Sequence, residues 1–303
     1  MFRFIHISYC KMTAVTDDHV DQMIDDIQSG VDRIQCLVPL TEDQMRRFTS
    51  TLAHNKTVMW IVFYDGRFSD ETLTIFCDFL RSNQTIELLE IYCNGDVGDR
   101  EIITLIDSLK ENKTIESVTL DAAKIGKPGL DAITSLLSSR WIEFDLRNTP
   151  IGSAGVRAIT EARLVHPTAD GHVIFEGSDI GDEEIQIICD FCEVNNGATE
   201  IYLRGNKITD KGAIRLANML KDDSEIIVID LQNNRIGSEG VKALIEMLSF
   251  NSTIHQIFLD GNDIGEDGMS ALRDLGDQFI DSDECIQIVR SRSSMVKSAG
   301  KVE

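Results

Sequence analysis

The chain repeats itself every 28 residues along its C-terminal third, and this period constrains its fold more than any other feature. Five residue columns keep the interval: Leu203, Leu231, Leu259; Asn206, Asn234, Asn262; Ile208, Ile236, Ile264; Gly212, Gly240, Gly268; and Leu216, Leu244, Leu272. Self-similarity at a fixed period of this length is typical of a solenoid, in which each repeat packs against its neighbours. The sequence therefore predicts one stack of similar units.

Each unit reads as one strand followed by one helix. Ile201 and Leu203 alternate with polar neighbours, which predicts a half-buried strand. Asn206 follows where the chain must turn, and its amide group can bond backbone groups that a tight coil leaves bare. Gly212 is expected to open a helix whose apolar residues, from Leu216 onward, keep helical spacing. Such a unit cannot bury its apolar face alone, so the next unit must cover it.

The same period, with slips of one or two residues, extends back through the rest of the chain. We count ten units and predict a closing strand at 285–289. A single repeat domain is expected over 1–289, with a capping repeat at 1–28 and a C-terminal repeat and cap at 253–289. Ser, Gly and four basic residues predict a flexible basic tail at 290–303.

One pattern in the repeat points to a known family. The run L-x-x-N-x-I-x-x-x-G-x-x-x-L-x-x-x-L, from Leu203 to Leu220, resembles the leucine-rich repeat of the ribonuclease-inhibitor-like subclass. Similar repeats occur in NOD-like receptors, tropomodulins and Ran GTPase-activating proteins. The resemblance implies an α/β fold: a right-handed, horseshoe-shaped solenoid of about ten repeats, with a parallel sheet on the concave side and helices on the convex side. The match is most specific over 197–272, and Ala123 and Glu101 depart from it.

Composition indicates an acidic protein without a membrane span. The net charge of −22 argues against nucleic-acid binding, because phosphate contacts need a cationic surface. The acidity either steers a basic protein partner or simply keeps a long solenoid soluble. Apolar runs are far shorter than the roughly 20 residues of a membrane helix, and no secretory signal is visible at the start. We expect a cytoplasmic location, or export into a host cell without a cleaved N-terminal signal.

Motifs that suggest chemistry are better explained by the repeat. Asn55, Asn83, Asn112 and Asn251 each begin an Asn-x-Thr glycosylation motif, but their spacing places them at the turn from one helix into the next strand. The pair Cys189 and Cys192 lies inside a predicted helix, where redox or zinc chemistry lacks a second ligand pair. The six histidines show no metal spacing. We therefore predict no catalytic residue, no metal and no cofactor.

The concave sheet face is the predicted partner-binding surface. Alternation along each strand fixes which side chains point into the hollow. Aromatic residues among charges are typical of an interface anchor, although they also suit cross-strand packing on a sheet, and both interpretations stay open. The predicted binding residues are Trp60, Tyr64, Glu90, Tyr92, Asp121, Asp145, Arg147, Glu176, Tyr202, Arg204, Asp230, Phe258 and Asp260.

Two classes of function follow from these observations. The first is a monomeric, non-catalytic scaffold that binds a protein partner on its concave face. The resemblance also implies an alternative, a GTPase-activating or other regulatory protein built on the same repeat, although no residue matches that branch one by one. A tropomodulin-like role is a further variant of the scaffold. A repeat array standing alone also resembles effectors that intracellular bacteria deliver into host cells.

Overall fold

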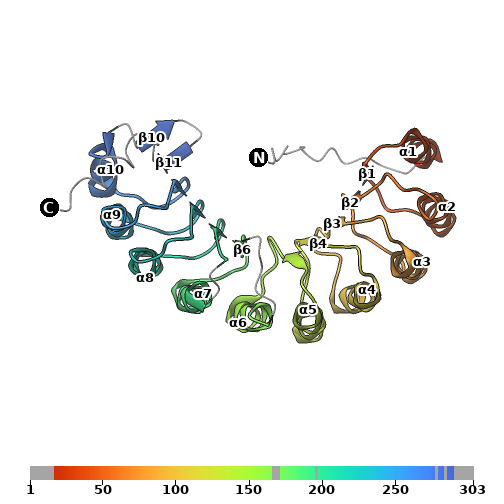
Figure 1. Cartoon of the computed structure of the whole chain (residues 1–303). Coiled ribbons are helices and arrows are strands. Elements are labelled where there is room, and N and C mark those ends of the chain that lie inside the picture. Colours follow the sequence, from red (N-terminus) through yellow and green to blue (C-terminus); the bar gives the residue numbers. More distant parts are fainter. Residues whose placement is uncertain (1–16, 166–170, 195–196, 277–278, 283–284, 290–303) are drawn as a thin grey trace.

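The chain forms a curved α/β solenoid with strands on the inside of the arc and helices on the outside (Figure 1). The computed structural model describes residues 17–165, 171–194, 197–276, 279–282 and 285–289. The tail predicted at 290–303 and the first part of the predicted capping repeat lie outside these residues. The alternation of strand and helix predicted from the period is confirmed.

Ten helices and eleven strands are present in the described part of the chain. The helices are α1 (Asp17–Ser29), α2 (Glu42–Leu52), α3 (Asp70–Ser82), α4 (Asp99–Glu111), α5 (Lys127–Ser139), α6 (Gly152–Arg163), α7 (Asp182–Val194), α8 (Asp210–Leu220), α9 (Ser238–Met247) and α10 (Glu266–Arg273). The strands are β1 (Arg33–Cys36), β2 (Trp60–Phe63), β3 (Leu88–Tyr92), β4 (Ser117–Asp121), β5 (Glu143–Asp145), β6 (His172–Ile174), β7 (Glu200–Tyr202), β8 (Val228–Asp230), β9 (Gln256–Phe258), β10 (Phe279–Ser282) and β11 (Cys285–Val289).

The strands form two sheets rather than one. Strands β1 to β5 pair in parallel, and so do β6 to β9. The strand predicted at 285–289 is present as β11, but it runs antiparallel to β9 and forms a hairpin with β10. The parallel sheet implied by the resemblance is thus divided between β5 and β6 and ends in an antiparallel hairpin.

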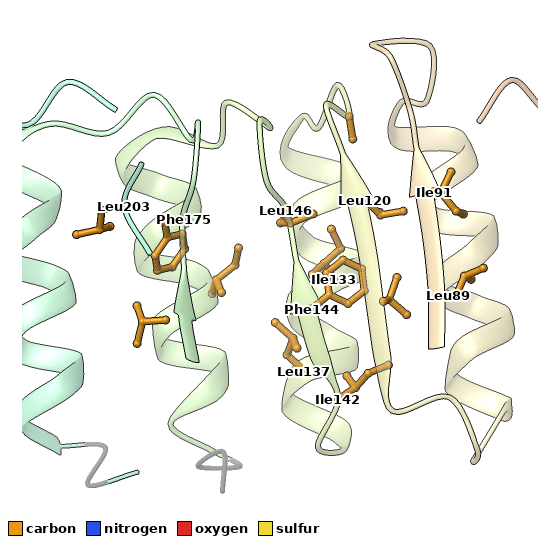
Figure 2. Packing of buried hydrophobic residues seen from close by; sticks show 14 of the residues in the cluster. Leu89, Ile91, Leu120, Ile133, Leu137, Ile142, Phe144, Leu146, Phe175 and Leu203 are labelled. Atoms are coloured by element: carbon orange, nitrogen blue, oxygen red, sulfur yellow. The ribbon is translucent and has the colours of Figure 1, made fainter. Parts of the chain in front are cut away.

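The core lies between the strand layer and the helix layer along the whole arc. Figure 2 shows part of it, where Leu89, Leu120 and Phe144 of the strands and Ile133 and Leu137 of α5 belong to the same buried cluster. These five side chains are buried. Because every repeat adds side chains at the same positions, one continuous apolar core runs through the stack and drives its assembly.

The predicted asparagine column forms a buried ladder between repeats. The Asn206 side-chain amide donates to the carbonyl oxygens of Phe175 (2.7 Å) and Leu203 (2.9 Å). Its Oδ1 accepts from the backbone N–H groups of Ser178 (3.1 Å) and Ile180 (3.2 Å). Equivalent bonds join Asn234 and Asn262 to the repeats before them. The ladder satisfies backbone groups that the tight turns would leave unpaired.

The glycine column has a role beyond that predicted. Helix α9 begins at Ser238, two residues before Gly240, so this glycine lies inside the first turn rather than at its start. The carboxylate of Asp210, at the start of α8, accepts from the backbone N–H groups of Gly237 (2.7 Å) and Gly240 (2.8 Å). A β-carbon on Gly240 would lie 2.7 Å from Ile236 Cγ2 and 2.8 Å from that carboxylate. Glycine at this position therefore permits the start of α8 to cap the start of α9.

Candidate functional site

The concave face of the sheet is the candidate site, because the described helices all lie on the convex side (Figure 1). Parallel sheets are normally covered on both faces, since their strands are built to be buried. Here the inner face carries half-buried aromatic and charged side chains instead of a second helix layer. A face of this kind is available to another molecule.

Aromatic side chains gather on the N-terminal half of this face. The rings of Tyr64 and Tyr92 stack, with centroids 5.1 Å apart and planes at 12°. The guanidinium of Arg33 lies 3.8 Å from the centre of the Trp60 ring, a cation–π contact that the sequence did not predict. The Tyr92 hydroxyl donates to Glu90 Oε2 at 3.3 Å. Cross-strand packing therefore accounts for part of this cluster, while its outer surface stays half exposed.

An ion pair occupies the middle of the face. The Arg147 Nε donates to Asp145 Oδ2 at 2.8 Å, and the Asn148 side chain donates to Asp121 Oδ1 at 2.8 Å. Burial opposes the charge on Arg147, but the Asp145 carboxylate outweighs it and raises the pKa of Arg147. Asp145 is only 3% exposed and is paired with the more exposed Arg147. Asp145 therefore differs from the prediction, and Arg147 presents the pair to solvent.

The C-terminal half of the face is mostly acidic. The Tyr202 hydroxyl donates to Glu200, and Arg204 Nη1 donates to Gln232 Oε1 at 3.2 Å. Asp230 is 8% exposed, and one oxygen accepts from the Gln232 backbone N–H at 2.9 Å. Like Asp145, it is less open than predicted. The remaining predicted residues of this half and of the middle, Glu176, Phe258 and Asp260, are half-buried on the face.

A histidine between two carboxylates was not among the predicted binding residues. The His172 Nδ1 lies 3.6 Å from Glu143 Oε1, and its Nε2 lies 3.5 Å from Glu200 Oε2. The His172 ring also meets the Tyr202 ring edge to face, with centroids 6.1 Å apart. The signal was present in the sequence, because these three residues occupy one strand column of successive repeats.

Partial burial leaves several concave carboxylates in an unfavourable environment. Burial raises the pKa of Glu90, Asp121, Glu176 and Asp230 above the usual carboxyl range. Burial and the neighbouring Glu90 carboxylate also raise the pKa of Tyr92 to about 12. A raised pKa means that the ionised form loses solvation it would have in water. A cation placed over these groups would relieve that cost.

The other sequence motifs have structural explanations in the described residues. Asn112 and Asn251 are buried and donate to carbonyl oxygens of the preceding repeat, as predicted for turn residues. Cys189 and Cys192 are buried thiols, and burial raises the pKa of each to about 12. No group of three or more metal-binding side chains comes together among the residues described. None of the described helices is both long and apolar enough to cross a membrane.

Comparison with known proteins supports the interpretation of the repeat. A family model described as "Leucine Rich repeat" matches residues 199–217 and 226–244, which cover β7 and β8 and most of α8 and α9. The chain has a leucine-rich-repeat fold. Among solved structures, this chain is similar to a chain of the "Crystal structure of Rad7 and Elc1 complex in yeast", with 12% identity and a TM-score of 0.48. That match covers 87% of this chain and 73% of the other. No curated protein sequence is significantly similar.

Proposed function

We propose that this leucine-rich-repeat protein is a non-catalytic scaffold that binds a protein partner across its concave face. The observation that carries the proposal is the open inner face of the parallel strands. This face bears stacked aromatic rings and partly buried carboxylates. Both features cost the free protein stability or solubility. Natural proteins often accept such a cost where a surface must bind.

The electrostatics favour a partner with a cationic segment. The chain carries a net charge of −22, and four concave carboxylates are incompletely solvated. Lysine or arginine side chains of a partner would restore favourable interactions to these carboxylates, and the long-range field would increase the association rate. The aromatic half of the face, at Trp60, Tyr64 and Tyr92, supplies the anchor that usually carries most of an interface's free energy.

The test combines cross-linking with a matched pair of variants. A photo-reactive residue at Tyr202 should capture a partner, whereas the same residue at Phe250, 65% exposed and beyond the end of α9, should not. The Trp60→Ala, Tyr64→Ala double variant should keep its circular dichroism spectrum and lose the captured partner, and Phe250→Ala should retain it. Capture that survives the double variant and is lost on changing convex helix residues would refute the concave-face proposal.

Two further expectations stay predictions. The GTPase-activating alternative would be supported if the protein accelerated GTP hydrolysis by a small GTPase, which a scaffold would not do. The cytoplasmic location, in the producing cell or in a host cell, is tested by fractionating cells that express the tagged chain.

A further inference from the structure

The strand layer has a seam between β5 and β6 that the helix layer does not share. Strand ladders join β1 through β5 and β6 through β9, but none joins β5 to β6 among the described residues. Helix α6 nevertheless packs against both α5 and α7, as each helix packs against its neighbours elsewhere in the arc. The interruption therefore affects only the concave side of the solenoid.

An arginine occupies a core position beside this seam. Arg163, the last residue of α6, lies four residues after Ile159, where seven other repeats place an apolar side chain. The equivalent residues are Leu52, Leu80, Leu109, Leu137, Cys192, Leu220 and Leu248, and all of them are buried. Arg163 is itself only 5% exposed. A guanidinium has replaced a leucine inside the core.

The guanidinium connects the two half-sheets. Its Nη2 donates to the carbonyl oxygen of Phe144 in β5 at 3.0 Å, and its Nη1 donates to the carbonyl oxygen of His172 in β6 at 3.3 Å. A buried charge needs such partners, because leaving it unpaired is very costly. The side chain therefore makes a connection across the seam where the strand ladder is interrupted.

Contacts on the concave side of the seam are also made by side chains. The His172 ring lies between the carboxylates of Glu143 in β5 and Glu200 in β7. Burial opposes the positive charge of Arg163 and lowers its pKa, while the Glu143 and Asp145 carboxylates favour that charge. One backbone hydrogen bond, from the Asn148 N–H to the Glu176 carbonyl oxygen at 2.8 Å, crosses the seam just beyond the strand ends. At the level of the strands themselves, side-chain hydrogen bonds and ion contacts cross a boundary that backbone ladders cross between the other parallel strands.

We propose that Arg163 is a clamp that joins the two halves of the sheet across the seam and sets their relative orientation. Lying at the middle of the arc, the clamp controls how the strands of one half face those of the other. This inference concerns the free protein and does not depend on the proposed function. If the concave face binds a partner, the clamp also determines the shape of that surface, and only this consequence rests on the proposed function.

The direct test restores the leucine of the repeat. In Arg163→Leu, β5 and β6 lose the side-chain bridge, and the two halves should settle at a different orientation. Distances between two spin labels are measured by double electron–electron resonance. The labels are attached to genetically encoded ketone side chains, so that the native thiols stay unmodified. One label pair, at Asp107 and Asn218, spans the seam; a second, at Glu71 and Asp107, lies within the N-terminal half.

We expect the cross-seam distance distribution to shift or broaden by a few ångström, the scale of the ~4.8 Å strand spacing. The pair within one half should not change. Arg157→Leu makes the same substitution at an exposed position of α6 and should change neither distance. A folded Arg163→Leu protein with an unchanged cross-seam distribution would overturn the proposal.

A second variant decides the question if Arg163→Leu does not fold. Arg163→Lys keeps a positive charge but lacks the planar fork that reaches both carbonyl groups. It should broaden the cross-seam distribution while leaving the distribution within the half unchanged. If Arg163→Leu fails to fold, a cross-seam distribution in Arg163→Lys identical to that of the parent protein contradicts the clamp.

Discussion

The asparagine ladder gives the sharpest stability prediction, and Asn234→Ala is the change that tests it. Asn234 is 6% exposed and bonds to both its own and the preceding repeat. Its amide donates to the carbonyl oxygens of Leu203 (2.9 Å), Leu231 (3.0 Å) and Gln232 (3.2 Å), and its Oδ1 accepts from the Ile208 N–H at 3.1 Å. The substitution removes all four bonds at once.

The cost is smaller than four bonds would suggest, because the ladder is redundant. The Leu203 oxygen still accepts from Asn206, and the Leu231 oxygen still accepts from Asn262. The Ile208 N–H, however, is buried and is left without its Asn234 partner. An orphaned buried group costs about 1–3 kcal/mol, and each lost net hydrogen bond costs about 1 kcal/mol. We expect a destabilisation of about 2–4 kcal/mol.

The measurement is urea unfolding followed by circular dichroism. Asn218→Ala is the matched control, because Asn218 is exposed on α8, where alanine favours the helix. Its midpoint should stay within the equivalent of about 0.5 kcal/mol of the parent protein. Equal midpoints for the two variants would show that the ladder does not stabilise the repeats as argued.

Two other changes follow from the packing and charge of the repeats. Gly240→Ala should destabilise the protein by about 1–3 kcal/mol in the same assay, because its β-carbon would meet Ile236 and the Asp210 carboxylate. Gly181→Ala, whose nearest contact would be at 3.7 Å, should be much milder, and equal effects would contradict the packing argument. Glu176→Gln should raise the melting temperature at pH 7, because burial raises the folded-state pKa of Glu176 and its ionised form opposes folding. That gain should vanish as the pH falls below the unfolded-state value of ~4.3, and a lower melting temperature at pH 7 would refute it.

The sequence predicted the repeating part of this fold well, because apolar periodicity is strong there. Leu203 and Asn206 recur at fixed intervals, so the strand, the turn and the ladder could be assigned from the sequence. The concave columns followed from strand alternation. Burial on that face did not, since Asp145 is buried and paired with Arg147 and a neighbouring side chain cannot be read from one column.

The seam was missed although its signal lies in the same alignment. Arg163 occupies a position that is leucine in most other repeats. The periodicity identifies this position as buried, but it does not show which groups the guanidinium would bond to there. The cross-repeat capping by Asp182 and Asp210 was also missed. Those two acids are 28 residues apart and two residues before the glycine column, so the pattern was visible. Its meaning required the distances between repeats.

The residues at the first position of successive helices, which include Asp99 and Lys127, also affect how the repeats unfold. Asp99 caps the next helix through the N–H groups of Gly126 (2.7 Å) and Gly129 (3.1 Å), but the following member of the column is Lys127, which instead pairs with Asp131 in its own helix. This break falls one repeat before the strand seam. In a linear array, cooperativity depends on the coupling between neighbours, and weak coupling marks where one unfolding unit ends and another begins. The arc is therefore expected to behave as two folding units, each responding as a whole to damage within it.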